Sequence, residues 1–382
     1  MSLYVPTGTP PLINGALARI ERRLPQPGEV LVRQGQRVEP EDVVARAYLP
    51  ANPQVMNVAR ALSIPPASVE RAMKKEVGNK VAQGEALAQA SPLLGRTYHA
   101  PIAGIITAVD SETGYVTITP DPVTHELQAT VRGIVMEIMP GRGVRIETPA
   151  AQVYGAFGVG PDRSGVLHLM VTDPSEQIEP DKITAKYAYA ILIGGSSITA
   201  NALRRAVKEQ VRGVIVGGIE ADELATFLGW SSTNNWRVGV GGWQMPGASA
   251  DKRCDLTLVV TEGFGQRPMS AALFEKLAAH DRQEALIEGT TQLRYPLIRP
   301  RVVIPLSART AGLQVEPPRP EVRPGAQVRL LDAEHLGTVG LVRAVSAGPR
   351  RLPSRIRVQA VDVILEDGSN VLLPLTAVEA LT

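Results

Sequence analysis

Two stretches near the amino terminus share one pattern of apolar and polar positions. RQGQRVEPEDVVARA covers residues 33–47, and EVGNKVAQGEALAQA covers residues 76–90. Each has a glycine, two polar residues, a valine, a turn and then alternating apolar residues, with Gly35 matching Gly78. Glycine suits a tight turn, and alternation is typical of a half-buried strand. The pattern therefore predicts the same turn and strand twice.

A second pair of similar stretches follows. APIAGIITAVDSETGYVTI covers residues 100–118 and ATVRGIVMEIMPGRGVRI covers residues 129–146, with Gly104 matching Gly133. Each predicts a short strand, a turn and another short strand. Repeated short strands without helices between them indicate a small antiparallel barrel or sandwich. We therefore predict that residues 25–150 form one pseudo-symmetric β-barrel whose halves superpose through Gly35/Gly78 and Gly104/Gly133.

These motifs resemble a known fold. VGNKVAQGEALAQA followed by YHAPIAGIITAV is similar to the lipoyl/biotinyl type of barrel-sandwich hybrid, whose strands read Gly-x-x-Val-x-x-Gly-x-x-Leu and Ala-Pro-x-x-Gly-x-Ile. The resemblance implies a domain over residues 1–150. That family attaches its cofactor to a lysine on the hairpin between the two strands. Here the hairpin, residues 91–99, contains no lysine, so we expect neither covalent biotin nor lipoate.

A helical insertion is expected within this domain. The sequence AMKK at Ala72–Lys75 looks like a biotin-attachment tetrapeptide, but it precedes the Gly-x-x-Val strand. It lies in PASVERAMKK, where Val69, Ala72 and Met73 mark one helical face. We interpret it as a solvated helix end, in an insertion of about residues 52–76 that is broken at Pro65–Pro66.

The periodicity changes after residue 150. YAYAILIGGSSITANALRRAVKEQVRGVIVGGI reads as a buried strand, a glycine-rich turn, an amphipathic helix and a second buried strand, which is a βαβ unit. GVLHLMVTD and DLTLVV add further strands, and EADELATFLG and SAALFEKLAAH add helices. The pattern predicts an α/β domain over residues 151–300, so the fold class is multidomain, α/β plus all-β.

The strongest candidate for a ligand site lies in three loops that follow apolar strands. They are GGSSITAN, GGIEAD and TEGFGQRPM. Loops at the carboxyl ends of parallel strands are common ligand sites, and a helix amino terminus suits an anion. The alternative is that these glycines only form tight turns and that Ser and Thr only cap helices. The ligand-binding candidates are Gly194, Gly195, Ser196, Ser197, Thr199, Gly217, Gly218, Glu262, Gly263 and Arg267.

Catalytic signatures are sparse. Glu262 directly follows a buried strand, so it is a weak candidate for a general base, although it could equally cap the next loop. The five histidines are not at metal-ligand spacing from one another or from the single cysteine, Cys254. We therefore predict no metal and no cofactor, and we favour a protein that is not an enzyme. Trp236 and Trp243 could mark an interface, but we interpret them as buried.

The carboxyl-terminal part reads as a linker and a small β module. Residues 301–321 are proline-rich and predict an extended linker. Residues 322–382 contain short strands, a Gly337-x-x-Gly340-x-Val342 motif and an Asp367-Gly368 turn. This module resembles a KOW-type SH3-like barrel, a resemblance that implies contact with nucleic acid or with protein.

An arginine-rich stretch without acidic residues lies inside this module. It provides candidate phosphate contacts, namely Arg343, Arg350, Arg351, Arg355 and Arg357. No aromatic residue interleaves with them, so base stacking has no support. The acidic residues of the module nearly balance its arginines, so its net charge is near zero. We therefore expect the module to dock protein, and nucleic-acid binding remains the alternative.

Composition restricts the function classes. Apolar residues make up 44% and charged residues 20% of the 382 residues, and the net charge is +2. These values are typical of a globular protein without a strong field toward nucleic acid or acidic lipid. No run of about 18 apolar residues occurs, so we expect a cytoplasmic protein that does not cross a membrane. The expected function is non-catalytic scaffolding or binding, with itself or a protein partner. The alternatives are an enzyme or sensor for a small anion, or a KOW-type nucleic-acid-associated protein.

Overall fold

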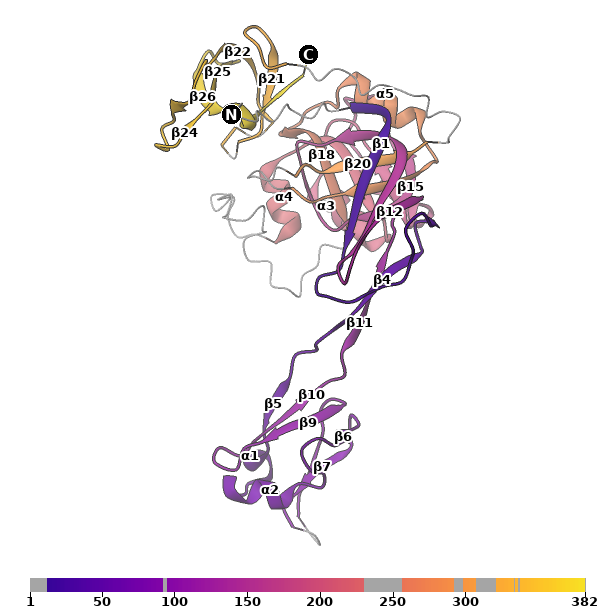
Figure 1. Ribbon diagram of the computed structural model, residues 1–382, viewed down its shortest axis with the longest axis vertical. Coiled ribbons are helices and arrows are strands. Elements are labelled where there is room, and N and C mark those ends of the chain that lie inside the picture. The colour runs from indigo at the N-terminus through magenta and orange to yellow at the C-terminus, as the bar shows by residue number, and fades with distance from the viewer. Residues whose placement is uncertain are drawn as a thin grey trace.

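The computed structural model describes residues 12–91, 95–229, 256–291, 298–306, 321–332, 334–335 and 337–381. The molecule is strand-rich and elongated, with a small β unit held away from the rest by a pair of extended segments (Figure 1). Predictions for Trp236, Trp243 and Cys254, and for most of the linker, lie outside the described residues. In the described part, no helix has the length and apolarity needed to cross a membrane.

The amino-terminal region forms two β units, not one. We call the first the basal unit. Its strands are β1 (Leu12–Arg23), β2 (Glu29–Val30), β3 (Arg37–Val38), β4 (Val43–Leu49), β11 (Val123–Gln128), β12 (Gly133–Met139) and β13 (Gly143–Tyr154). We call the second the apical unit. Its elements are β5 (Gln54–Asn57), α1 (Val58–Leu62), α2 (Val69–Ala72), β6 (Lys80–Val81), β7 (Ala86–Gln89), β8 (Thr97–His99), β9 (Gly104–Val109) and β10 (Tyr115–Thr119).

The apical unit is inserted into a hairpin of the basal unit. Strands β4 and β11 pair antiparallel, from Val43 opposite Gln128 to Leu49 opposite Val123. The chain between them forms the apical unit at their far end (Figure 1). Each unit has its own buried core, so the prediction of a single barrel over residues 25–150 is corrected to two nested units. α1 and α2 lie within the predicted helical insertion, and α2 ends at Ala72.

The two units repeat one hydrogen-bond pattern. Gly35 N donates to Val135 O at 2.7 Å, and Gly78 N donates to Ile106 O at 2.7 Å. Gly133 pairs with Val38 in one unit, just as Gly104 pairs with Val81 in the other. The glycine pairs chosen from sequence are therefore equivalent, but they relate two units and not two halves of one barrel.

Close packing explains why Gly104 and Gly133 are glycines. A Cβ on Gly104 would lie 2.4 Å from Thr119 O, and a Cβ on Gly133 would lie 2.7 Å from Glu147 O. These contacts are shorter than any normal carbon–oxygen approach, and the obstacle is backbone. Both units therefore need glycine at the start of β9 and of β12, where β9 lies against β10 and β12 lies against β13.

The α/β domain shares a sheet with the basal unit. Its strands are β14 (Phe157–Val159), β15 (Arg163–Leu169), β16 (Ala190–Ile193), β17 (Gly213–Ile219), β18 (Thr257–Phe264), β19 (Glu284–Glu288) and β20 (Arg301–Pro305), and its helices are α3 (Ala200–Lys208), α4 (Ala221–Leu228) and α5 (Ala271–Ala279). Strands β15 to β18 pair in parallel, with α3 between β16 and β17. The sheet order is β14-β18-β17-β16-β15-β19-β20-β13-β12-β3, with β1 on β13.

Two predicted boundaries differ from this arrangement. Residue 150 lies in the middle of β13, which pairs with β1 and β12 of the basal unit and with β20. Residues Arg301–Pro305, predicted as part of the linker, form β20, and Val302, Val303 and Ile304 are fully buried. Three consecutive β-branched residues favour a strand covered on both faces, so this segment belongs to the sheet.

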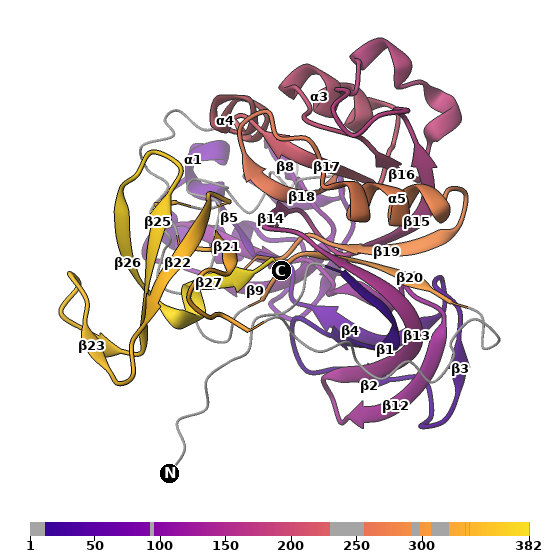
Figure 2. The same ribbon diagram turned by 90° about the horizontal axis from the view of Figure 1, so that it is seen from above.

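The carboxyl-terminal module follows. Its strands are β21 (Gln327–Leu330), β22 (Val339–Val345), β23 (Arg350–Arg351), β24 (Arg357–Val358), β25 (Ala360–Leu365), β26 (Asn370–Pro374) and β27 (Val378–Ala380). Five form a sheet in the order β26-β25-β22-β21-β27, and β23 and β24 form a separate ribbon. The ribbon projects from the module at the edge of the molecule (Figure 2).

We predict that Gly104→Ala and Gly133→Ala each lower the free energy of unfolding by roughly 1–3 kcal/mol, because the added Cβ overlaps backbone. Chemical denaturation followed by circular dichroism measures the change. Gly348→Ala is the matched control, because nothing lies within 4 Å of its added Cβ. Equal stability of Gly104→Ala and Gly348→Ala would contradict the packing argument.

Candidate functional site

The three predicted strand-end loops do come together. Strands β16, β17 and β18 are parallel neighbours, so the loops after them share one edge of the sheet. Gly217 N donates to Gly195 O at 2.8 Å, and Gly218 N donates to Ser196 O at 2.6 Å. The glycine-rich loops after β16 and β17 are therefore in direct contact.

Backbone, however, already fills the space between these loops. A Cβ on Gly195 would lie 2.4 Å from Glu176 O, and one on Gly217 would lie 2.1 Å from Arg267 O. Gly218 approaches Gly265 O in the same way, and Gly194 packs against Ile178. Ser196 and Ser197 are buried. The glycines thus allow the loops to pack on one another, which is the alternative interpretation of their sequence.

The amino terminus of α3 already has an anionic partner. Thr199 Oγ1 accepts a hydrogen bond from Ala202 N at 3.2 Å, as a helix cap does. The Glu223 carboxylate accepts one from Ala200 N at 2.6 Å. Because the Glu223 carboxylate already lies at the positive end of the α3 dipole, an external anion would have to compete with it for the N–H group of Ala200.

Glu262 contacts the carboxyl-terminal module instead of an open cavity. Its Oε1 accepts a hydrogen bond from Ser270 N at 3.1 Å, and its Oε2 forms an ion pair with Arg329 of β21. Next to it, Gly263 packs so closely on Gly337 that a Cβ on Gly337 would lie 2.5 Å from Gly263 Cα. Arg267 Nε donates to Phe264 O at 2.8 Å. These contacts favour the capping interpretation of Glu262 over the catalytic one.

A buried network of two arginines and two glutamates joins the modules. Arg329 Nη1 lies 3.5 Å from Glu379 Oε2, and Glu379 also pairs with Arg299. The side chains of Arg299, Arg329 and Glu379 are 4%, 3% and 1% exposed, and that of Glu262 is 13% exposed. The four formal charges cancel, as burial of charge requires. The network therefore fixes the carboxyl-terminal module on the α/β domain.

A large charged cleft, not expected from sequence, lies between the basal unit and the α/β domain. Its volume is 970 Å³. Arg22 Nη1 donates to Asp162 Oδ2 at 2.9 Å, and Arg301 pairs with Glu288. Burial, with a further contribution from Glu288, raises the pKa of Asp162 above its usual range. Burial alone would lower the pKa of Arg301, but the Glu288 carboxylate outweighs it and raises that pKa.

The cleft is internally compensated. Arg19 pairs with Glu147 and Arg23 pairs with Glu21, so each of these arginines has a carboxylate partner. The carboxylate partners of Arg19 and Arg22 lie 128 and 140 residues away along the chain, and no local motif could have indicated them. The Arg22–Asp162 pair joins the basal unit to the α/β domain, which favours a role in holding the two together.

The candidate phosphate-contact residues are mostly brought together. Arg350, Arg351, Arg355 and Arg357 lie on the β23–β24 ribbon and are exposed, whereas Arg343 lies apart on β22. Arg351 stands directly opposite Arg357 in the ladder. Like charges at opposite positions destabilise a strand pair. The repulsion between Arg351 and Arg357 therefore opposes the pairing of β23 with β24.

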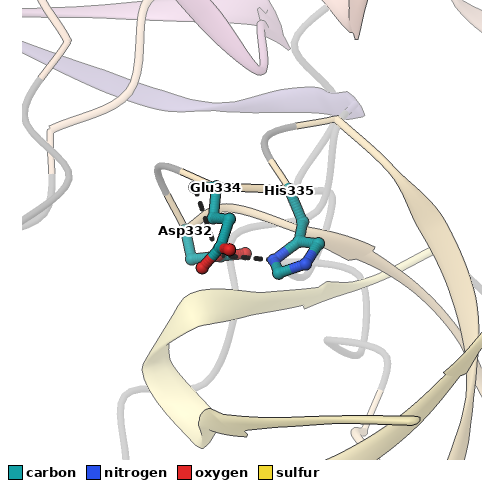
Figure 3. A group of neighbouring side chains, drawn as sticks. All are labelled: Asp332, Glu334 and His335. Atoms are coloured by element: carbon teal, nitrogen blue, oxygen red, sulfur yellow. Dashed lines mark hydrogen bonds and ion pairs between the residues drawn. The ribbon is translucent and has the colours of Figure 1, made fainter. Parts of the chain in front are cut away.

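One group of side chains could hold a metal ion. Asp332, Glu334 and His335 lie in the loop between β21 and β22, and their ligand atoms lie within 4.8 Å of one another (Figure 3). His335 Nδ1 is 2.8 Å from Asp332 Oδ2. One imidazole and two carboxylates suit a divalent transition metal. Sequence reasoning considered only spacing between histidines and cysteine, and so missed an Asp-x-Glu-His cluster.

No model of a protein family matches this chain, and no curated protein matches it.

We predict that Arg329→Met lowers the free energy of unfolding by roughly 3–5 kcal/mol, because it leaves buried carboxylates uncompensated. Adding Glu262→Gln should restore part of that loss, because it removes one of them. Denaturant titrations of both variants measure this, with exposed Glu275→Gln as the control. A double variant less stable than Arg329→Met alone would contradict the pairing of Glu262 with Arg329.

Proposed function

We propose that the protein is a non-catalytic binding and assembly protein that associates with a second copy of itself through the outer face of the apical unit. The packed strand-end loops and the paired Glu262 support a non-catalytic role for that edge of the α/β domain. The observation that carries the proposal is a difference between the two equivalent units.

The outer face of the basal unit carries a row of ion pairs. Glu21, Arg145 and Glu137 stand opposite one another on three adjacent strands. Arg145 Nη2 lies 2.8 Å from Glu21 Oε1, and its Nη1 pairs with Glu137. Hydrogen bonding from Arg145 is the largest cause of a lowered Glu21 pKa. This face is therefore suited to water.

The equivalent row of the apical unit has no charge. Val55, Thr117 and Ala108 stand opposite one another on β5, β10 and β9, at the positions of Glu21, Arg145 and Glu137. Val55 is 61% exposed, and Tyr115 nearby is 42% exposed. Because the basal unit tolerates charges at these positions, the fold does not require an uncharged row here.

A sheet face with an uncharged row of this kind is suited to packing against another sheet. Two sheets pack face to face when their outer side chains can interdigitate without burying charge. A second copy supplies an identical face, and a two-fold axis brings the two together as an isologous pair. The apical unit stands away from the body (Figure 1), so the remaining modules do not obstruct this approach.

We predict that light scattering gives the wild-type protein a mass twice that of one chain. Val55→Glu/Thr117→Arg, which installs the charge pair of the basal unit, should return the mass to that of one chain. The reverse change, Glu21→Val/Arg145→Thr, is the matched control and should leave the dimer intact. A wild-type monomer at every concentration, or equal dissociation of both variants, would contradict the proposal.

The β23–β24 ribbon favours a second candidate function, namely binding of duplex nucleic acid. Four exposed arginines lie on the ribbon, three on its two short strands and Arg355 in the turn between them, and no ion pair within the described residues neutralises them. A two-stranded β-ribbon fits the major groove of duplex DNA. Phosphates would also relieve the repulsion between Arg351 and Arg357. This differs from the protein docking that the near-neutral charge of the whole module suggested.

We predict that Arg351→Ala/Arg357→Ala flattens the dependence of log K on log salt by about two, one for each lost phosphate contact. A fluorescence anisotropy titration with duplex DNA at several salt concentrations measures the slope. Arg33→Ala/Arg37→Ala removes the same charge from exposed positions of the basal unit and should leave the slope unchanged. Equal effects of the two double variants would show that net charge alone matters, and would refute recognition by the ribbon.

A further inference from the structure

A small pocket lies at the seam between the basal unit and the α/β domain. Its volume is 290 Å³, near the lower end of the range usual for ligand sites. The basal unit contributes the turns at Pro40–Glu41 and at Thr130–Arg132. The α/β domain contributes the amino ends of β15 and β19 and the residues just before β16 and β17. We call it the seam pocket. It lies at the opposite edge of the sheet from the packed strand-end loops.

Two arginines of the seam pocket have no carboxylate partner within the described part of the chain. Arg212 Nη1 donates to Ser164 O at 2.7 Å, and its guanidinium stacks 5.2 Å from the Tyr189 ring centroid. Arg132 Nη2 donates to Pro305 O at 3.0 Å. Each guanidinium keeps further N–H groups for another acceptor. The arginines of the charged cleft, in contrast, are matched by carboxylates.

Two glutamates line the same pocket. Glu41 and Glu284 form no ion pair with the pocket arginines or with any other described residue. Much of the rest of the wall is apolar, including Val166 and Pro305, and Thr130 and Ser164 also line the pocket. A simple anion would meet two carboxylates here, and a simple amine would meet two guanidinium groups. A ligand that carries one charge of each sign fits both pairs.

Two residues that line this pocket have a left-handed backbone conformation. Tyr189 and Thr130 have φ values of 64° and 61°, a region that is unfavourable for bulky and β-branched residues. Tyr189 follows the 3-10 helix at Ala185–Tyr187, and the other four described non-glycine residues with positive φ follow helix ends or lie at the tip of the β23–β24 ribbon. Thr130 has no such local explanation. Strain that local structure does not explain is typical of ligand sites.

The apical unit provides an internal control for the polar residues of the pocket. Ala129 N donates to Asp42 O at 2.9 Å, and the equivalent Ala100 N donates to Glu85 O at 2.8 Å. Counting from these alanines, Thr130 corresponds to Pro101 and Arg132 to Ala103. By the same count from Asp42 and Glu85, Glu41 corresponds to Gly84. The shared fold therefore requires neither the charges nor the strained threonine.

We propose that the seam pocket binds a small zwitterion with the chemistry of an α-amino acid. The ligand carboxylate accepts hydrogen bonds from Arg132 and Arg212, and its ammonium group donates to Glu41 and Glu284. Its side chain packs against the apolar wall and the Tyr189 ring. This site is independent of the proposed self-association, because β15, which contributes to its lining, lies in the body of the molecule and away from the apical unit (Figure 1).

Calorimetric titration of the full chain tests this with three probes of one shape. L-Phenylalanine has both charges, 3-phenylpropionate lacks the ammonium group, and 2-phenylethylamine lacks the carboxylate. We expect L-phenylalanine to bind at least 10-fold more tightly than either, the effect of one charge-assisted hydrogen bond. If 3-phenylpropionate bound as tightly as L-phenylalanine, the proposal that the ligand is a zwitterion would be overturned. Absence of binding by both L-phenylalanine and L-leucine at about 10 mM would overturn the site.

Substitutions in the pocket test the contacts of the ligand's ammonium group and of its carboxylate separately. Glu41→Gln should weaken L-phenylalanine about 10-fold and leave 3-phenylpropionate unchanged. Arg212→Gln should weaken the binding of both L-phenylalanine and 3-phenylpropionate, because both carry the carboxylate. If Arg212→Gln unfolds at a lower temperature than the wild type, Arg132→Gln, at an exposed position, repeats the test. Glu112→Gln and Arg60→Gln, exposed on the apical unit, are the controls. Wild-type affinity in Glu41→Gln and Arg132→Gln would overturn the proposal.

Discussion

Strand β13 is the constraint on which the arrangement of the body depends. β1 pairs along its whole length, β12 pairs with residues 143–147 and β20 pairs with residues 150–154. Its side chains divide between two cores: Val144, Ile146 and Ala150 lie in that of the basal unit, and Ala151 and Val153 lie in that of the α/β domain. Because successive side chains of a strand point to opposite faces, one strand completes both cores. Leu286 and Val303 of the α/β strands also enter the basal core, so the two modules stabilise each other.

The repeats predicted local structure well and topology poorly. Each glycine and valine motif forms the expected turn and strand, with the same register twice. Their partners could not be read from the motifs, because residues 33–47 and 76–90 are equally suited to either second stretch. Loop closure costs less for the nearer pair, so residues 76–90 pair with residues 97–109 and the outer stretches must meet around them. This difference in loop-closure cost explains why one unit is nested within the other. The prediction of a single barrel did not take it into account.

The candidate ligand loops show a different limit of sequence reasoning. Glycine is required both where a ligand approaches backbone and where backbone approaches backbone, and Gly195 and Gly217 are of the second kind. Glu262 was singled out because it follows a buried strand, yet its partner Arg329 lies 67 residues further along the chain. Nothing in the local pattern distinguishes a carboxylate that meets substrate from one that meets a distant arginine. Nearness of the loops was predictable, because parallel strands end together. The backbone that fills the space between the loops could not be predicted from the sequence.

The two nested units separate what the fold requires from what it does not. Positions that agree in both, such as Gly104 and Gly133, are explained by the shared backbone, because a side chain would overlap the same carbonyl in each. Positions that differ cannot be explained in that way. The row Val55, Thr117 and Ala108 replaces three charges, and Glu41, Thr130 and Arg132 stand where the apical unit has Gly84, Pro101 and Ala103. One set lies on the outer face of the apical unit and the other lines a pocket of the basal unit. The two copies of one fold thus differ at surfaces outside their own cores, and those are the surfaces where function is to be sought.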